Sequence, residues 1–398
     1  MRSSPSPARQ ARLLAAAREI VESFGPRPAG SPAEAQTAEY IRDRFQAAGL
    51  EVSMQPVEVS TRSHLAQIIG YLLLVVSAIS LTYSAPLAAA TALAGVAILA
   101  TEAAAIPAVS RLLPRSRSHN VVGRRGARQS PLRTVVFLAH LDTAQPTLFS
   151  APRAVLIQRQ SFLFALNAGV ILLVLAVMAI FTDLSGLVWI GFAAGLYLIF
   201  HLGVLVHGVL NLPASPGAND DASGLAALIE LAGTLPALEQ TDAWFVATAG
   251  HETGMAGTHA FLASSGLRPA STLLVNLDSI GSGTVTLSMV EGQVRSVPVP
   301  RKVLGMAGDV VAALDLPVQA RPHQETNSAA YLALRSGMPA ITIYGLDRRG
   351  AIPNWHWTSD RPDRLEPSTM EVATQLASGL ALKLDEELAA ASRQRMEG

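Results

Sequence analysis

The chain contains no cysteine among its 398 residues. This absence excludes disulfide bonds, thiolate metal sites and a cysteine nucleophile, so His, Asp and Glu are the available metal ligands. Net charge is also absent, because 30 Lys and Arg balance 30 Asp and Glu, and nothing in this balance suggests a nucleic-acid partner. Only 15% of the residues are charged and half are hydrophobic. Such a chain is too apolar for a purely soluble protein and too polar for a simple bundle of membrane helices.

Four long apolar runs account for this composition. They cover residues 65–84, 86–109, 161–182 and 184–210. Each approaches or exceeds the ~20 residues that a helix needs to cross a bilayer. Buried core helices are the alternative, but runs of this length with almost no charge rarely suit a soluble core. We therefore predict four transmembrane helices, paired as hairpins at 65–109 and 161–210.

The charges beside these runs predict their orientation. The connections inside the two hairpins, YSAP and TDLSG, carry no Lys or Arg. The outer flanks carry Arg62, Arg111, Arg115, Arg117, Arg153 and Arg159. By the positive-inside rule these flanks face the cytoplasm, and the opening MRSSPSPARQARLL lacks the apolar core of a secretory signal. Segments 1–62, 111–160 and 211–398 are thus expected to form one domain on the cytoplasmic face of the membrane.

The segments outside the hairpins alternate between helical and strand patterns. Helical spacing is found in ARLLAAAREIVESFG and PAEAQTAEYIRDRFQAAGL, with Gly49 placed to end the second helix. Short apolar runs rich in β-branched residues, typical of strands, are RTVVFLAH, DAWFVATAG, STLLVNLD and MPAITIYG. Strands separated by helices predict an α/β fold with a mostly parallel sheet covered by helices.

Candidate metal ligands follow these strands. They are His140 and Asp142 after RTVVFLA, His251 and Glu252 after WFVATAG, Asp278 after STLLVNL, His356 in the loop after MPAITIYG, and Asp220 and Asp221 in GANDDASG at a helix start. In open α/β sheets ligands collect beyond the carboxyl ends of the strands. We therefore expect these side chains to converge.

The chemistry of this set is coherent. Two His and three carboxylates can hold two divalent cations if one carboxylate bridges them, and two such metals can share a hydroxide and polarise a carbonyl. Asp142, two residues after His140, can accept the second imidazole N–H and orient the ring. Taken alone, His-x-Asp is a common polar pair at a strand end and GANDDASG a turn with a helix cap. Their joint occurrence in this order favours a metal site.

In this combination the residues resemble the co-catalytic zinc aminopeptidases of the MH clan, such as aminopeptidase Y and the bacterial leucyl aminopeptidases. The match begins with GPRPAGSPAEAQTAEYIRDRFQAAGLEV and HNVVGRR, and it ends with HWTSDRPDRL. The resemblance implies a mixed, mostly parallel sheet in a three-layer domain, here with the two hairpins inserted. It also implies a peptide substrate with a free amino terminus and two divalent metal ions, with Zn²⁺ preferred over Mn²⁺ or Co²⁺.

The resemblance also assigns roles to individual residues. The expected metal ligands are His140, Asp220, Glu252, Asp278 and His356. His140 and Asp278 would bind the first metal, and Glu252 and His356 the second. Asp220 would bridge the two, and its peptide bond to the next residue would be cis.

Further residues are expected around these ligands. Asp142 would support His140. Positions behind the ligands or facing the substrate are Asp221, Trp355, Asn327 and Tyr331. Two of these depart from the family pattern: Trp355 stands where a Tyr-type donor is usual, and Asn327 replaces an acidic residue in TNSAAYLALRSGMPA.

His251 is the main departure, because it occupies the place of the family's general-base Glu. Two nearby cations would keep its imidazole neutral. A neutral imidazole can take a proton from water and deliver it to a leaving amine. Two alternatives stay open: His251 marks a degenerate site kept for structure or binding, or it approaches a metal itself.

The sequence therefore predicts a multi-pass membrane metalloaminopeptidase with His251 as general base. A site beside the membrane suggests short or apolar peptides, such as fragments of membrane proteins. One alternative is a weak or inactive peptidase-fold protein that acts as a membrane-anchored binding or scaffold module. Another is a transporter, for which only Glu102, His201 and His207 offer polar groups within the spans.

Overall fold

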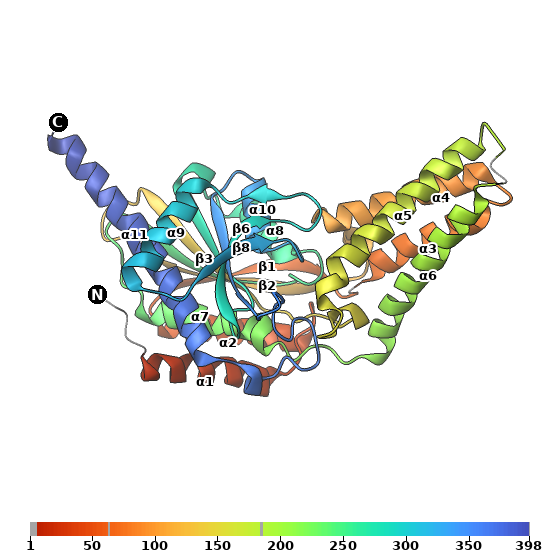
Figure 1. Ribbon diagram of the computed structural model, residues 1–398. Helices are drawn as coiled ribbons and strands as arrows, with labels where there is room; N and C mark the ends of the chain where they lie inside the picture. Colours follow the sequence, from red (N-terminus) through yellow and green to blue (C-terminus); the bar gives the residue numbers. More distant parts are fainter. Residues whose placement is uncertain (1–5, 63, 184–185, 398) are drawn as a thin grey trace.

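The computed structural model describes residues 6–62, 64–183 and 186–397, without the side chains of 389–397. Residues 1–5 of the predicted cytoplasmic segment, residue 63, residue 398 and residues 184–185 of the second predicted hairpin lie outside the described residues. The chain forms a helix-covered sheet and, beside it, a bundle of four apolar helices (Figure 1).

A nine-stranded sheet organises the larger part. Its strands are β1 (Glu51–Ser60), β2 (Arg115–Arg125), β3 (Arg133–His140), β4 (Thr241–Thr248), β5 (Thr272–Leu277), β6 (Thr284–Glu291), β7 (Val297–Pro298), β8 (Gln319–His323) and β9 (Ala340–Leu346). Their order is β1-β2-β4-β3-β5-β9-β6-β7, with β8 beside β6. The central strands β4, β3, β5 and β9 are parallel, while β1, β2, β6 and β7 pair antiparallel. The prediction of a mostly parallel mixed sheet is confirmed in its mixed character and its parallel centre, while the flanking strands add antiparallel pairs.

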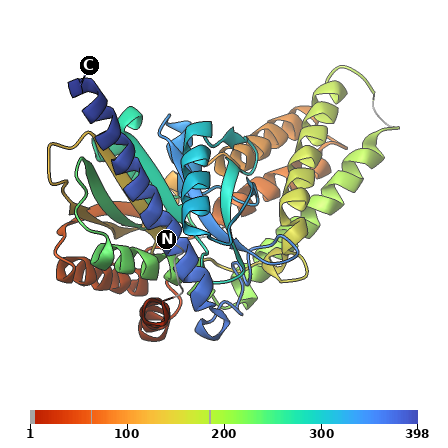
Figure 2. The same cartoon turned by 60° about the vertical axis from the view of Figure 1, so that its left-hand side comes forward.

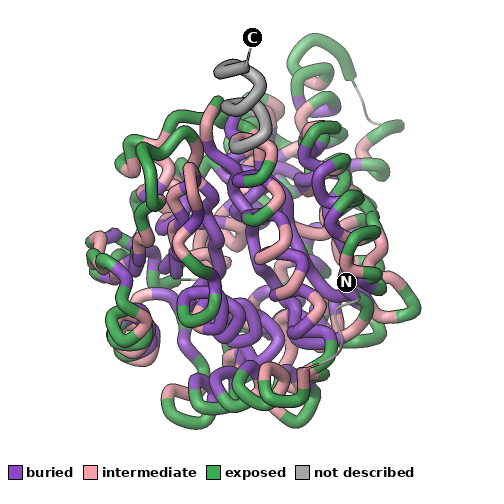
Figure 3. Tube along the Cα trace, turned by 90° about the vertical axis from the view of Figure 1, so that its left-hand side faces the viewer, coloured by how far each residue is buried: buried purple, intermediate pink, exposed green. Residues whose placement is uncertain are grey.

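Helices cover both faces of this sheet (Figure 2). They are α1 (Pro7–Phe24), α2 (Pro32–Ala47), α7 (Ser223–Thr234), α8 (Ala256–Ser264), α9 (Arg301–Leu314), α10 (Ala329–Arg335) and α11 (Pro367–Glu397). In β3, Val135 and Phe137 join the core under α1, α2, α7, α9 and α11, while Val136 and Leu138 join the core under α8 and α10. A strand buried on both faces reads as a continuous apolar run, which is why RTVVFLAH shows no alternation. The buried residues gather in the sheet and on the inner sides of the helices (Figure 3).

Local signals in the sequence explain the first two helices. Ser6 caps α1 by accepting the N–H of Arg9, and Ser31 caps α2 by accepting the N–H of Glu34. A proline follows each cap, as suits the first position of a helix. Gly49 follows α2 with φ of 74°, a left-handed conformation that glycine adopts without strain.

The bundle consists of α3 (Leu65–Ser80), α4 (Ala85–Ala103), α5 (Gln158–Ala179) and α6 (Val188–Asn211). Close packing joins α3 to α4, since a Cβ on Gly95 would lie 2.8 Å from the carbonyl oxygen of Gly70. Outward-facing side chains such as Phe164, Leu196 and Phe200 are exposed. Small residues at helix contacts and large apolar ones outside are typical of helices that pack within lipid.

Three of these helical stretches are long and apolar enough to cross a membrane: Ala85–Ala103, Val155–Ala179 and Val188–Asn211. α3 is shorter, with 16 residues, so four full spans are not shown. The second predicted span covers residues 86–109, but its helix, α4, ends at Ala103. The helix stops there because Ala105 takes a φ of 54° and Pro107 follows. The multi-pass arrangement and the cytoplasmic orientation stay predictions.

The two hairpins are inserted next to the strand ends where ligands are predicted. The α3–α4 hairpin connects β1 to β2, and the α5–α6 hairpin connects β3 to α7. The second hairpin therefore begins shortly after His140 and Asp142, and it ends shortly before Asp220. The bundle thus lies at the same end of the sheet as the candidate site.

Candidate metal centre

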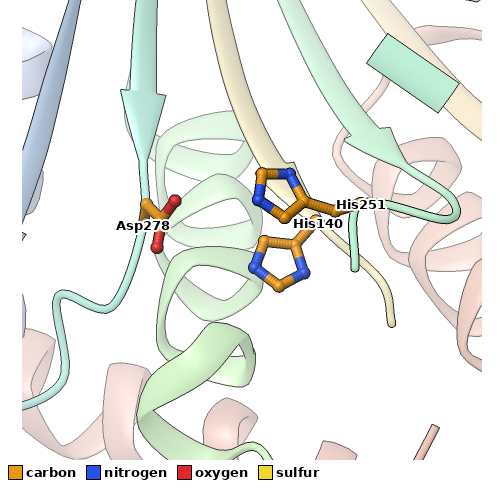
Figure 4. Close-up of side chains that lie close together, drawn as sticks. All are labelled: His140, His251 and Asp278. Carbon is orange, nitrogen blue, oxygen red and sulfur yellow. The ribbon is translucent and has the colours of Figure 1, made fainter. Parts of the chain in front are cut away.

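The five predicted ligands converge beyond the carboxyl ends of the parallel strands. His140 ends β3, Glu252 follows β4, Asp278 follows β5, Asp220 precedes α7, and His356 lies in the loop after β9. Ligand atoms of His140, His251 and Asp278 lie within 4.8 Å of one another, and so do those of His140, Asp220 and Glu252. Figure 4 shows His140 beside His251, with Asp278 at the end of the neighbouring strand.

Asp220 lies between two imidazoles. Its Oδ1 is 3.1 Å from Nε2 of His140, and its Oδ2 is 3.2 Å from Nε2 of His356. Oε1 of Glu252 is also 3.2 Å from Nε2 of His356. This is the position expected of a bridging carboxylate. The peptide bond between Asp220 and Asp221 is cis, as the resemblance implies.

The chemistry of the cluster fits a metal cation. Oδ2 of Asp220 and Oε1 of Glu252 are buried and both face the single Nε2 of His356, which has at most one proton to donate, so at least one of the two oxygens lacks a donor. Buried acceptors of this kind are costly unless something satisfies them. Imidazole nitrogens and carboxylate oxygens together suit zinc and similar divalent metals. The residues present therefore fit a bound metal.

The electrostatics lead to the same conclusion. Burial alone would lower the pKa of His356, but the charges of Glu252 and Asp220 raise that pKa to about 10. Burial would raise the pKa of Asp220, yet hydrogen bonds with His140 and His356 hold it well below its usual range. The negative potential that attracts protons to these imidazoles would equally attract a metal cation.

His140 is oriented by a backbone group. Its Nδ1 is 2.9 Å from the backbone carbonyl of Asp142, so a proton on Nδ1 leaves the Nε2 lone pair free for a metal. The Asp142 carboxylate is 3.7 Å from this nitrogen and instead accepts the N–H groups of His251 at 2.8 Å and Glu252 at 2.9 Å. The hydrogen bond to His140 thus comes from the carbonyl of Asp142, while an orienting role of its carboxylate stays a prediction. β3 ends at His140, so the two residues no longer share one strand face.

His251 stacks on His140, with ring centroids 4.3 Å apart and planes 13° from parallel. Its Nδ1 is buried and has no hydrogen-bond partner. Burial and the positive charge of His140 lower the pKa of His251. The ring is thus a neutral imidazole that has one nitrogen without a partner and that offers a nitrogen within 4.8 Å of Asp278, which suits both a proton acceptor and a further metal ligand.

Asp221 holds the backbone behind the ligands. Its Oδ2 accepts the N–H of His140 at 3.0 Å, and its Oδ1 accepts those of Gly224 at 3.1 Å and Ser279 at 3.3 Å. These bonds connect the end of β3, the start of α7 and the end of β5. Asp221 is fully buried and so lies behind the ligands, away from substrate.

The other three expected residues take different places. The ring centroid of Trp355 is 4.0 Å from that of His356, and Trp355 and Asn327 both line the cavity at the ligands. Asn327 accepts the N–H of Gln293 and donates its amide to the carbonyl of Ala103 at 2.7 Å. An ionised aspartate has no donor for that carbonyl, so an amide suits this position. The structure does not bring Tyr331 to the cavity; it is fully buried in the cluster that contains Ala105.

Two buried carboxylates that support the site were missed from the sequence. Glu34 accepts the N–H groups of Gly30 and Gly250 and the hydroxyl of Ser118, and burial with the charge of Asp142 raises its pKa to about 7. Asp360 accepts the N–H of Asp220 at 3.0 Å, and burial raises its pKa to about 8. Both positions fix the backbone beside a ligand.

Arg27 is a third missed residue. Its guanidinium is fully buried and donates to the carbonyls of Gly25, Leu141, Pro216 and Gly217. Burial lowers its pKa to about 10. Arg27 and Glu34 lie in GPRPAGSPAEA, and Asp360 lies in HWTSDRPDRL. The sequence signal that could have identified these three supporting residues is that each is a charged residue within a segment that resembles the family.

The sequence and the fold were compared with known proteins. The model of peptidase family M28 matches residues 201–381. No curated protein matches the chain.

Solved structures with a similar fold include zinc aminopeptidases and glutaminyl cyclases. BSAP, a zinc aminopeptidase from Bacillus subtilis, has a TM-score of 0.58 at 13% identity over 95% of each chain. The aminopeptidase from Aneurinibacillus sp. strain AM-1 has a TM-score of 0.55 at 15% identity over 93% of this chain and 92% of its own. The Acidobacteriales bacterium glutaminyl cyclase has a TM-score of 0.56 at 14% identity over 97% and 98%. The predicted resemblance to the co-catalytic zinc aminopeptidases and their fold is confirmed.

Proposed function

We propose that this chain, with its match to peptidase family M28, is a membrane-anchored metallo-exopeptidase of the aminopeptidase type. The observation that carries the proposal is the placement of Asp220 between His140 and His356, at 3.1 and 3.2 Å. Around it lie Glu252 after β4 and Asp278 after β5, the strands on either side of β3. When bound there, divalent metal ions would polarise the peptide carbonyl and activate water for attack.

His251 is the proton carrier in this proposal. It is neutral by virtue of its lowered pKa, and its backbone N–H is fixed by Asp142. It accepts the proton released by the attacking water and returns it to the leaving amine. A group in this role typically contributes 10²–10⁴-fold to the rate, by the usual magnitude for general bases.

The preference for a free amino terminus is supported by charge. Glu102 and Glu325 line the cavity beside the ligands, together with one cationic side chain, Arg62. A protonated amine is attracted by carboxylates, whereas a substrate carboxylate is repelled by them. The same cavity would therefore disfavour a carboxypeptidase substrate.

A second candidate is a binding or scaffold module with little or no turnover. It is favoured by the position of His251, whose ring atom lies within 4.8 Å of the ligand atoms of His140 and Asp278. If His251 binds a metal there, it no longer serves as a base. The two candidates make opposite predictions for variants of His251.

The test is hydrolysis of peptides with free amino termini by detergent-purified full-length protein with Zn²⁺, Mn²⁺ or Co²⁺. Glu252→Ala is the control that should have no activity. A peptide with amino-terminal glutamine tests for cyclisation, the reaction named in the glutaminyl cyclases of similar fold. We expect His251→Ala to lose about 10²–10⁴-fold in kcat while bound zinc, measured by elemental analysis, is unchanged. We expect His251→Glu to restore turnover.

Two results would contradict this assignment. Metal bound by the wild type without any turnover favours the binding module. Loss of both zinc and turnover in His251→Ala makes His251 a ligand and not the base.

A further inference from the structure

One cavity of about 230 Å³ joins the metal ligands to the helical bundle. Asp220, His251, Glu252, Asp278 and His356 line it on the side of the sheet, and all four bundle helices contribute to the opposite side. The cavity is slightly smaller than typical small-molecule sites of roughly 300–1,000 Å³. A cavity of this size suits the terminal residue of a peptide.

The bundle side of this cavity combines polar side chains, such as Gln67, Glu102 and Gln158, with a group of aromatic and aliphatic ones. We call the group Tyr71 of α3, Phe149, Phe162 of α5, and His201 and Leu205 of α6 the bundle wall. The ring centroid of His201 lies 4.9 Å from that of Phe149 and 5.4 Å from that of Tyr71. The bundle wall contains no side chain with a permanent charge. It therefore favours an apolar group.

Hydrogen bonds hold the bundle wall in place. Nε2 of His201 is 2.9 Å from the hydroxyl of Ser161. The Tyr197 hydroxyl is 2.9 Å from the same hydroxyl and 3.0 Å from the Ser161 carbonyl. His201 is only 3% exposed and Tyr71 only 2%. A wall fixed in this way recognises a ligand with little loss of side-chain entropy.

On the bundle side of the cavity, Gln67, Glu102 and Gln158 lie near the ends of their helices. Glu102, in the last turn of α4, accepts the backbone N–H of Ser110 at 3.1 Å and its hydroxyl at 2.8 Å. Asn327 ties the neighbouring loop to Ala103. The bundle and the sheet domain are thus joined at the cavity itself, so the helices contribute to its shape.

We propose that the bundle wall is the pocket for the side chain of the substrate's terminal residue, and that it selects aromatic and large aliphatic residues. This inference rests on the proposed exopeptidase function. An exopeptidase cleaves next to a chain end, so the terminal residue must lie beside the metal ligands. The side chain of that residue then meets the bundle wall. Peptide ends of this chemistry are those released from membrane-spanning segments.

The kinetic test uses alanyl, leucyl, phenylalanyl and lysyl amides of 7-amino-4-methylcoumarin with zinc-loaded full-length protein. We expect leucyl and phenylalanyl substrates to exceed the lysyl substrate at least tenfold in kcat/KM. Leu205→Trp fills the pocket and should lower phenylalanyl hydrolysis about tenfold relative to alanyl hydrolysis, within the usual range for pocket contacts. Leu196→Trp, on the outward face of the same helix, should leave the ratio unchanged. A preference for the lysyl substrate, or an equal effect of Leu205→Trp on every substrate, would contradict the proposed role of the bundle wall.

A second measurement does not depend on turnover. A dipeptide with amino-terminal p-benzoylphenylalanine is photo-cross-linked to the protein, with zinc or with a chelator, and the labelled residues are found by mass spectrometry. We expect labels at or beside the bundle wall. If the labelled residues lie only in the sheet domain, or if no residue is labelled, the bundle wall is not the pocket. Labels at the bundle wall without hydrolysis of any substrate support the pocket and contradict the proposed peptidase.

Discussion

The guanidinium of Arg27 does not line the cavity, yet it holds two ligand-bearing segments together. Its guanidinium donates to Leu141, between His140 and Asp142, and to Gly217, three residues before Asp220. Arg27→Met would leave buried carbonyls without donors. We expect it to lower the free energy of unfolding by at least about 1–3 kcal/mol, the usual cost of leaving one buried acceptor without a donor.

Chemical denaturation in detergent measures this effect. Arg18→Met is the matched control, because Arg18 is exposed on α1, and it should stay within about 0.5 kcal/mol of the wild type. Equal stabilities of the two variants would show that Arg27 is dispensable.

The same residues mark the limit of what the sequence predicts. Four of the five ligands were found because they follow apolar strands, and strand ends of a parallel sheet meet at one edge. Asp220 was found because GANDDASG places it at a helix start. The partners of Arg27, Glu34 and Asp360 were not found, because they are backbone groups. Backbone groups leave no pattern in a sequence. The hydrogen bond of His140 was missed for the same reason, since its Nδ1 pairs with the backbone carbonyl of Asp142.

At the scale of helices and strands, prediction was best where apolar runs are long or buried on both faces. RTVVFLAH coincides with β3, while β6 and β8 were not predicted. β8 (QARPH) is largely exposed and polar, so no apolar pattern marks it. The bundle wall could not be predicted from the sequence either. Tyr71, Phe149 and His201 are far apart along the chain and meet only through helix packing.

Glycine positions give the packing of the bundle a direct test. A side chain at Gly95 would collide with the carbonyl of Gly70 and with Leu74, whereas a Cβ at Gly203 of α6 meets nothing within 4 Å. We expect Gly95→Leu to destabilise the protein by about 1–3 kcal/mol through overpacking. Gly203→Leu should be close to neutral. Thermal unfolding in detergent compares the two, and equal melting temperatures would contradict the packing of α3 on α4.

For the whole molecule, the absence of cysteine makes the membrane orientation measurable with single labels. Tyr83, between α3 and α4, is 68% exposed, and Gln46 is exposed on α2. We expect a membrane-impermeant maleimide to label Tyr83→Cys in intact cells and Gln46→Cys only after permeabilisation. The reason is that arginines lie on the domain side of both hairpins. Labelling of Gln46→Cys in intact cells would reverse the orientation.

The short α3 has a consequence for the predicted insertion of the bundle in a membrane. Sixteen residues rise about 24 Å at 1.5 Å per residue, less than the ~30 Å hydrocarbon core of a typical bilayer. Hydrophobic mismatch would then tilt the helices or thin the bilayer at a modest cost per Å. Since Tyr71 of α3 lines the cavity, the proposed hydrolysis would then depend on acyl-chain length. Hydrolysis of the phenylalanyl substrate should therefore be faster in vesicles of short-chain lipids than in long-chain ones, with the alanyl substrate less affected.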